Sequence, residues 1–246
     1  MIRVRIIRTE GSVPREAGAE MVVSRDSTSG SIGGGQLEYM AIDRARQMLR
    51  RGEARAQMDV PLGPMIGQCC GGKAWLLLDR SPPTPEARAG SVLIFGAGHV
   101  GRALALALAP LPLRSLLIDS RKAELAMAAP GVETRLTPLP EAELRTAPQG
   151  AAVVILTHDH ALDFLLGIEA LGRPDLSYIG MIGSATKRAR FASHARAAGL
   201  DPLRLICPIG GKAVADKRPS VIAALTVAEI LTRLAAARLT VSPCNI

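Results

Sequence analysis

The stretch Ser91-Val-Leu-Ile-Phe-Gly-Ala-Gly-His-Val-Gly101 decides the fold of this 246-residue chain. Val92 to Phe95 are apolar without alternation, which is typical of a strand buried on both faces of a parallel sheet. Gly96, Gly98 and Gly101 follow with the spacing G-x-G-x-x-G. Glycines at this spacing allow a tight turn and a close approach of the backbone to a phosphate. The stretch therefore predicts a strand, a nucleotide-type binding loop and the start of a helix.

The residues after the loop fit the same interpretation. A helix is expected from Val100 to Ala109, and its N-terminus presents free N–H groups to an anion, with His99 beside it. The next apolar run ends at Asp119. This is close to the distance of about 20 residues at which dinucleotide-binding folds place an acid that accepts from a ribose hydroxyl. The spacing leaves open whether the physiological ligand is a dinucleotide.

Strands and helices alternate from residue 91 onward. Strands are expected at 91–95, 115–119, 132–136, 151–157, 177–181 and 204–207. Helices are expected at 100–109, 161–171, 185–198 and 219–237, with shorter helical turns near 122–128 and 141–145. This alternation predicts an α/β fold, a Rossmann-like doubly wound parallel sheet over residues 91–246.

Residues 1–80 have a different pattern, which predicts a small α+β domain ahead of the Rossmann-like domain. Strands are expected at 3–9, 19–24, 55–60 and 73–78, with a further strand that starts at Ser31 and an amphipathic helix at 36–51. Prolines cluster between the two domains, so residues 81–90 are expected to form a linker.

Glycine and polar residues recur where four of the predicted parallel strands end. They form Gly-Ala-Gly-His at 96–99, Thr-His-Asp-His at 157–160, Gly-Met-Ile-Gly-Ser at 180–184 and Cys-Pro-Ile-Gly-Gly at 207–211. Ligands bind beyond the carboxyl ends of the strands in such a sheet, so a ligand crevice is expected there. Its candidate ligand contacts outside the glycine loop are His158, Asp159, His160, Gly183, Ser184 and Lys187.

Two of these features have more than one interpretation. His158 and His160 share a face of an extended segment, so both imidazoles can reach one metal ion. Acid–base chemistry and a pair that faces a polar ligand are the alternatives. Lys187 lies in the first turn of a predicted helix, where a cation opposes the helix dipole. It therefore indicates either a bound anion or a solvated helix face.

The predicted N-terminal domain contains two further candidates. Gly33, Gly34 and Gly35 precede Gln36 at a helix start, where they form either an anion cradle or a flexible turn. The second candidate is the adjacent pair Cys69-Cys70, which cannot form a C-x-x-C redox pair or an unstrained disulfide. Soft thiolates suit molybdenum, copper(I) or persulfide chemistry, whereas two small buried apolar residues are the alternative.

The composition limits the partners. The formal net charge of +8 and a pI near 9.9 favour anionic ligands or an acidic protein partner. No block of basic residues is interleaved with aromatic residues, so a nucleic acid is not expected as a partner. The longest apolar tract, at 103–113, is too short to cross a bilayer, and the first residues alternate like a strand, so we expect them to be neither a signal peptide nor a transit peptide. We therefore expect no membrane association and a cytoplasmic location.

The sequence resembles the xanthine dehydrogenase accessory proteins of the XdhC/CoxI family. The segments that carry the resemblance are GSVPREAG at 11–18, SIGGGQLE at 31–38, LGPMIGQCCGG at 62–72, the glycine loop at 92–101, THDHALD at 157–163, YIGMIGS at 178–184 and ICPIG at 206–210. They follow one another along nearly the whole chain. The glycine loop occurs in many folds, whereas QCCGG and THDH are specific.

The resemblance implies a function and a set of partners. It implies a chaperone that binds the molybdenum cofactor (molybdopterin), protects it during sulfuration and inserts it into the molybdenum-binding subunit of xanthine dehydrogenase. It also implies a homodimer, a cysteine desulfurase as a second partner, and Cys69 or Cys70 as the candidate molybdenum contact. The expected protein is thus an accessory protein rather than an enzyme. Two alternatives use the glycine loop and Asp119 instead: an NAD(P)-dependent oxidoreductase and a dinucleotide-sensing module.

Overall fold

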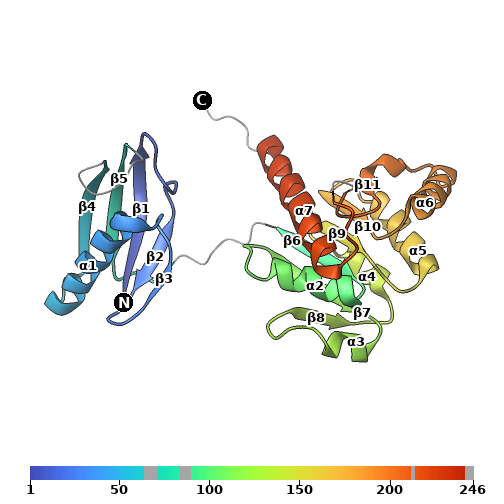
Figure 1. Ribbon diagram of the computed structural model, residues 1–246, viewed down its shortest axis with the longest axis horizontal. Helices are drawn as coiled ribbons and strands as arrows, with labels where there is room; N and C mark the ends of the chain where they lie inside the picture. The colour runs from blue at the N-terminus through green and yellow to red at the C-terminus, as the bar shows by residue number, and fades with distance from the viewer. Residues whose placement is uncertain (64–70, 84–89, 212–213, 242–246) are drawn as a thin grey trace. The chain divides into compact units, whose positions relative to one another are not determined.

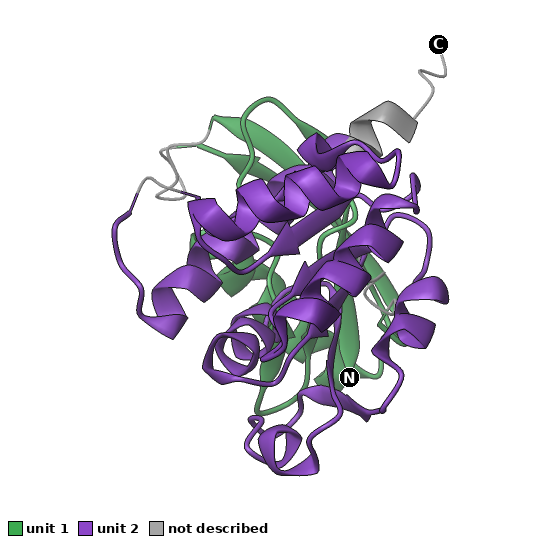
Figure 2. Ribbon diagram, turned by 90° about the vertical axis from the view of Figure 1, so that its right-hand side faces the viewer, with its two compact units in different colours: residues 1–85 green, residues 86–246 purple. Residues whose placement is uncertain are grey.

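The computed structural model describes residues 1–63, 71–83, 90–211 and 214–241 (Figure 1). The chain divides into two compact units, Met1–Pro85 and Glu86–Ile246 (Figure 2). The division falls inside the segment 81–90 that the sequence predicts as a linker. Each unit has its own sheet and its own hydrophobic core.

Unit 1 is an antiparallel five-stranded sheet with one helix, α1. The strand order is β3-β2-β1-β5-β4, and all neighbouring pairs are antiparallel. Its elements are β1 (Ile2–Glu10), β2 (Glu20–Val23), β3 (Thr28–Gly30), α1 (Gly35–Arg51), β4 (Arg55–Leu62) and β5 (Gly72–Asp79). The small α+β domain that the sequence predicts is confirmed.

The core of unit 1 follows from two periodicities. Alternate residues of β1 are buried, namely Ile2, Val4 and Ile6. Buried residues of α1 recur every three or four positions, which places one apolar stripe of the helix against the sheet; they are Leu37, Ala41, Ala45 and Met48.

One predicted element of unit 1 is wrong. The strand that was expected to start at Ser31 is instead β3, which ends at Gly30. The Glu38 carboxylate accounts for the difference, because it accepts hydrogen bonds from Ser31 Oγ (2.6 Å) and from the N–H of Ile32 (2.9 Å). These bonds turn the chain away from the sheet and into α1.

Unit 2 is a parallel six-stranded sheet in the order β11-β10-β9-β6-β7-β8. The strands are β6 (Ser91–Phe95), β7 (Arg114–Asp119), β8 (Glu133–Leu136), β9 (Ala152–Ile155), β10 (Tyr178–Met181) and β11 (Leu205–Ile206). The helices are α2 (His99–Leu108), α3 (Lys122–Ala126), α4 (Pro140–Arg145), α5 (His160–Leu171), α6 (Ala185–Ala197) and α7 (Pro219–Val241). The Rossmann-like fold predicted for this part of the chain is confirmed.

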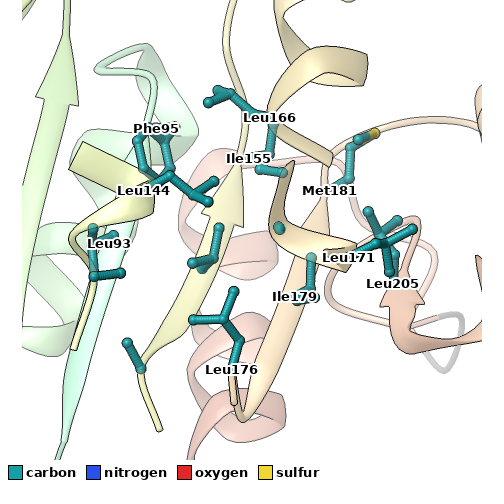
Figure 3. Close-up of a cluster of buried hydrophobic side chains, with 14 of the residues drawn as sticks. Leu93, Phe95, Leu144, Ile155, Leu166, Leu171, Leu176, Ile179, Met181 and Leu205 are labelled. Carbon is teal, nitrogen blue, oxygen red and sulfur yellow. The ribbon is translucent and has the colours of Figure 1, made fainter. Parts of the chain in front are cut away.

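Alternate residues of the central strand β6 belong to two cores. Leu93 and Phe95 enter a core that is closed by α4, α5 and α6 (Figure 3). Val92 and Ile94 enter a core on the other face, which is closed by α2 and α7. These two helices pack side by side (Figure 1). Because helices cover both faces, the strand carries apolar residues at each of the positions 92–95.

The helix that the sequence predicts at 219–237 contains one long apolar segment. By length and composition, Pro219–Ala236 of α7 is apolar enough to cross a membrane, with a mean hydropathy of 1.4. Within unit 2, however, Ala223, Ile230 and Leu234 are buried and pack in the core with α2. In this structure one side of α7 covers the sheet, and 22% of this segment is buried.

Candidate functional site

The crevice of unit 2 lies where the strand order reverses. From β6, the next strands β7 and β8 lie to one side, whereas β9, β10 and β11 lie to the other. Loops at the carboxyl ends diverge at such a point and leave room for a ligand. A small cleft is found there, and its lining includes Gly96, Asp119, Thr157 and His158. The structure therefore brings the loops after β6, β7 and β9 together.

Glycine stands at three positions of the binding loop, and the structure explains these positions in different ways. A Cβ on Gly96 would collide with the carbonyl oxygen of Leu156, and a Cβ on Gly101 would collide with the carbonyl oxygen of Gly96. These two glycines are therefore required by the packing of the fold. Gly98 has an ordinary φ of −66°, and no protein atom lies within 4 Å of the position of a Cβ there. The fold does not need glycine at 98, and the space beside the N-terminus of α2 is open at this position.

Asp119 differs from the prediction. Its carboxylate accepts from the N–H of Ala97 (2.7 Å), from the N–H of Arg121 (2.9 Å) and from two nitrogens of the Arg121 guanidinium (3.0 and 2.8 Å). Each carboxylate oxygen accepts two of these bonds, so the lone pairs of the carboxylate, about four in number, are all occupied. The interpretation of Asp119 as a free acceptor for a ribose hydroxyl is corrected: it holds the glycine loop in place.

Electrostatics agree with this role of Asp119. Burial by itself raises the pKa of the carboxyl, but hydrogen bonds from Arg121 and Ala97 outweigh it and lower the pKa to about 2. On the other side of the loop, Arg102 donates to the carbonyl oxygen of Ala97 (2.6 Å) and pairs with Glu124 (2.6 Å). The peptide groups around Ala97 are therefore clamped from both sides. Sequence reasoning missed Arg102, Arg121 and Glu124, because nothing in their spacing distinguishes them from surface charges.

The segment Thr157–His160 is a helix cap. Oδ1 of Asp159 accepts from the N–H groups of Ala161 (2.7 Å) and Leu162 (3.4 Å), so it starts α5. His160 is thereby the first helical residue, and it lines a different cavity from His158. The two imidazoles do not share one extended face, which corrects that interpretation. Within the described ranges, no group of three His, Cys, Asp or Glu side chains is placed to hold a metal ion.

Lys187 has a partner inside the protein. Its ammonium pairs with Asp163 of α5, whose other oxygen accepts from the N–H (3.0 Å) and the hydroxyl (2.7 Å) of Thr157. The Asp163 side chain is 1% exposed and that of Lys187 is 10% exposed. The charge of Lys187 is therefore neutralised within the site, and the pair ties α6 to α5 and to the end of β9.

The loop after β10 supports the start of α6. Ser184 is the N-cap residue, and its Oγ accepts from the N–H of Lys187 (3.2 Å). A Cβ on Gly183 would lie 3.0 Å from the Sγ of Cys207 and 2.8 Å from Cδ of Lys187, so packing explains this glycine. Burial raises the pKa of the Cys207 thiol, while Lys187 and Arg188 lower it to a smaller extent.

The predicted anion cradle of unit 1 is partly filled from within. Oε1 of Glu38 accepts from the N–H of Gly34 (2.9 Å) as well as from Ser31 and Ile32. Burial raises the pKa of Glu38, but these hydrogen bonds outweigh it and lower the pKa overall. An internal carboxylate thus takes the place of a bound anion at Gly34. Contacts of Gly33, Gly35 and Gln36 with a ligand stay a prediction.

The loops that carry the family resemblance in unit 1 lie together. A Cβ on Gly33 would come within 2.5 Å of Cγ of Pro14, so these two loops touch. Likewise, Gly72 at the start of β5 lies so close to Ser12 that any side chain there would collide with its backbone. Cys69 and Cys70 lie outside the described residues, between Leu62 and Gly72.

The sheet and the loops at its carboxyl edge define a doubly wound α/β protein with a glycine loop at the N-terminus of α2, which is the place where such folds bind anions. Residues 92–230 match the family model of the XdhC Rossmann domain, and residues 1–60 match that of the XdhC and CoxI family. The chain belongs to the XdhC and CoxI family, as the sequence resemblance predicts.

The chain is also similar to one curated protein in sequence and to one solved structure in fold. An uncharacterized protein of Escherichia coli, YqeB, is 26% identical over 244 residues, which are 92% of this chain and 42% of that protein. The chain thus spans less than half the length of this relative. A crystal structure described as a xanthine dehydrogenase from Bacillus halodurans matches with a TM-score of 0.80 and 18% identity, covering 98% of this chain and 94% of that one. At this identity the likeness shows a common fold.

Proposed function

We propose that this protein binds the molybdenum cofactor as a cargo, shields it while its terminal sulfur ligand is installed, and delivers it to a xanthine dehydrogenase. Membership of the XdhC and CoxI family supports an accessory role. The fold shared with a protein described as a xanthine dehydrogenase supports a link with that enzyme. The observation that carries the proposal is the open space at Gly98, because a pyranopterin phosphate is an anion and the N-terminus of α2 attracts one.

The residues of the carboxyl edge fit such a cargo. His99 begins α2 beside Gly98, and the exposed imidazoles of His158 and His160 offer donors and acceptors nearby in the same unit. Asp159 and Ser184 cap the two adjacent helices. These imidazole and hydroxyl groups can bind and orient a polar ligand, and one carboxylate oxygen of Asp159 is already used to cap α5.

The remaining parts of the proposal concern partners. They are the molybdenum-binding subunit of xanthine dehydrogenase as the client, a cysteine desulfurase as the sulfur donor and a second copy of the chain in a homodimer. Cys69 or Cys70 would face the molybdenum, since thiolates are ligands that this metal accepts. A cytoplasmic location is part of the same proposal.

A dinucleotide is the second candidate ligand, because the glycine loop has the right form for its pyrophosphate. The occupied carboxylate of Asp119 argues against it, since the usual acceptor for the ribose is already used. An NAD(P)-dependent oxidoreductase and a dinucleotide-sensing module therefore have weaker support than cofactor delivery.

The proposal is tested with substitutions at Gly98. The chain is produced together with the cofactor pathway and purified without oxygen, and molybdenum and pterin are measured per chain. Wild type should retain about one equivalent of each. Gly98→Asp should retain far less, because a carboxylate would stand where the anion binds, yet it should melt no lower, because aspartate is a good N-cap residue.

Gly98→Asn is the matched control. It caps the helix equally well and is neutral, so it should lose less cofactor than Gly98→Asp. Wild-type protein that holds neither molybdenum nor pterin refutes the proposal. Steady oxidation of NADH or NADPH by the wild type, with loss of that activity in Gly98→Asp, would favour the oxidoreductase instead.

A further inference from the structure

A groove runs along the outer side of α5, between α4 and α6. A hollow of about 640 Å³ is lined by residues of all three helices, and a second hollow of about 410 Å³ continues it toward the start of α6. The two hollows are neighbours, because Ala161 and Phe164 line both of them. From Ala161 to Ile168 the groove follows α5 for about two turns, which is roughly 10 Å at 1.5 Å per residue.

The floor of this groove is apolar. Four apolar residues of α5 line it with the spacing i, i+3, i+4 and i+7, namely Ala161, Phe164, Leu165 and Ile168. The opposite side of the helix is apolar as well, with Leu166 and Leu171 buried in the core beneath it (Figure 3). A helix that is apolar all round is normally buried on every side, yet Leu165 is 48% exposed. The described residues therefore leave one apolar side of α5 uncovered.

The central side chain of the floor, Phe164, is held in place. Its ring meets the ring of the buried Phe191 edge to face, with the centroids 5.4 Å apart, and the ring of His194 lies 5.9 Å away. Both of these rings belong to α6, so Phe164 is fixed between two helices. A partner that packs on a surface already ordered loses less conformational entropy on binding.

The two rims of the groove differ in charge. On the α6 rim, Arg190 is exposed and pairs with no carboxylate in the described part of the chain, and α6 itself contains no acid. Lys187 is neutralised by its ion pair with α5. On the α4 rim, Arg145 pairs with Glu169 through two hydrogen bonds (2.8 and 3.1 Å), and Glu141 lines the same hollow. The α6 rim is therefore positive, whereas the α4 rim has a net negative charge.

We infer that this groove binds an amphipathic helix of a partner protein, with the apolar stripe of that helix on α5 and its acidic side chains toward Arg190. Laying the apolar face of a helix into an apolar groove is a recurrent mode of recognition, and two turns of α5 match anchors at i, i+3 or i+4, and i+7. The net charge of +8 also favours an acidic partner. The inference goes beyond the proposed function, since a protein helix and not the cofactor fills the groove.

A second copy of the chain is the other occupant to consider, and its charges disfavour it. Two copies that each carry a net charge of +8 repel one another. The longest helix of the described ranges, α7, has the exposed apolar residue Leu231 but a single acid, Glu229. That carboxylate accepts from the hydroxyl of Tyr178 in its own unit (2.7 Å), so α7 offers no acid to Arg190. A homodimer of this chain is therefore expected to use another surface.

The test uses the full-length chain and three fluorescein-labelled helical peptides of equal length, and binding is followed by fluorescence anisotropy. The first peptide has a stripe of leucines with glutamates beside it, the second has lysines in place of the glutamates, and the third has serines in place of the leucines. Wild type should bind the first roughly tenfold more tightly than the second, because attraction to Arg190 becomes repulsion. High salt should reduce this difference. The third peptide should not bind measurably, because it buries no apolar stripe.

Two variants and two matched controls locate the binding. Arg190→Glu should reverse the preference, so that the lysine peptide binds more tightly than the glutamate peptide. Leu165→Ser should weaken both roughly tenfold, because apolar area on the floor is lost. Arg188→Glu changes an exposed arginine of α6 that lines neither hollow and should keep the wild-type preference. Leu203→Ser changes a leucine that is 86% exposed and lines neither hollow, and it should bind as wild type does.

Four results would overturn the inference. Wild type that binds the glutamate and lysine peptides equally, or binds neither, shows that the groove does not select an acidic helix. An equal response of Arg188→Glu and Arg190→Glu would reduce the effect to the general charge of α6. A wild-type dimer in sedimentation velocity that Leu165→Ser converts into a monomer would assign the groove to a second copy.

Cofactor retention, measured on the same variants, separates this inference from the proposed function. Neither Leu165 nor Arg190 is among the residues proposed to hold the cargo, so their variants should retain as much molybdenum and pterin as wild type. Wild type that selects the glutamate peptide but holds no cofactor refutes the proposed function alone. Wild type that holds cofactor but selects no peptide refutes this inference alone. Circular dichroism melting of each variant confirms that the protein tested is folded.

Discussion

Asp119 acts as a structural clamp, and its carboxyl has a folded pKa of about 2 against an ordinary value of 3.8. The depressed pKa stabilises the folded state above the unfolded pKa, and this contribution is lost as the pH falls through the folded value. We therefore expect Asp119→Asn to lower the free energy of unfolding of unit 2 by about 2 kcal/mol at neutral pH. The difference from wild type should shrink between about pH 4 and pH 2. Urea unfolding monitored by circular dichroism measures it.

Asp216 provides the control for this prediction. It pairs with Arg218, two residues on, as Asp119 pairs with Arg121, but Arg218 is largely exposed. Asp216→Asn should change stability much less, because water screens an exposed ion pair. Equal effects of the two substitutions would show that Asp119 is not a clamp.

At the scale of the elements, one ion pair joins three pieces of unit 2. Asp163 of α5 binds Thr157 after β9 and Lys187 of α6. Replacing Lys187 by methionine leaves a buried carboxylate without its cation, which costs about 3 kcal/mol or more. We expect Lys187→Met to lower the melting temperature markedly. The double variant Asp163→Asn/Lys187→Met should recover part of the loss.

The recovery is what distinguishes a buried ion pair from simple packing. Both variants lose the same lysine, so a double variant that melts lower than Lys187→Met alone would mean that the charge of Asp163 is not the cause. Arg190→Gln, on the same helix, should leave the melting temperature near that of wild type, because its side chain is exposed and without a partner in the described residues.

At the scale of the whole molecule, the two units have separate cores. The single tryptophan of the chain, Trp75, lies in β5 of unit 1. Six of the seven α-helices of the described residues belong to unit 2. Tryptophan fluorescence therefore follows unit 1, whereas circular dichroism at 222 nm follows mainly unit 2.

We expect denaturant unfolding to show two transitions that do not coincide in the two signals. Gly101→Ala should move only the circular dichroism transition, because the added Cβ would collide with the carbonyl oxygen of Gly96 in unit 2. Gly98→Ser is the control and should move neither, since no protein atom lies near its Cβ position and serine is a good N-cap residue for α2. A shift of the fluorescence transition in Gly101→Ala would mean that the two units unfold as one.

The sequence by itself determined the fold class and where most elements lie. Residues 92–95 are apolar at every position because both faces of β6 are covered, and strands alternate with helices because a parallel sheet needs crossovers. The sequence also determined the family, since its short specific segments keep their order along the chain. These are properties of local pattern, which the chain carries before it folds.

Only the tertiary structure decided which side chains of the carboxyl edge have internal partners. In unit 2, Asp119 is saturated by Ala97 and Arg121, and Lys187 by Asp163. The reason is physical: a charged or polar group is available to a ligand only when no other group of the fold satisfies it, and the folded loops and helices bring these partners within reach. Gly98 and Arg190 stay accessible for the same reason. Among the described residues, no atom lies within 4 Å of a Cβ at Gly98, and no carboxylate pairs with Arg190.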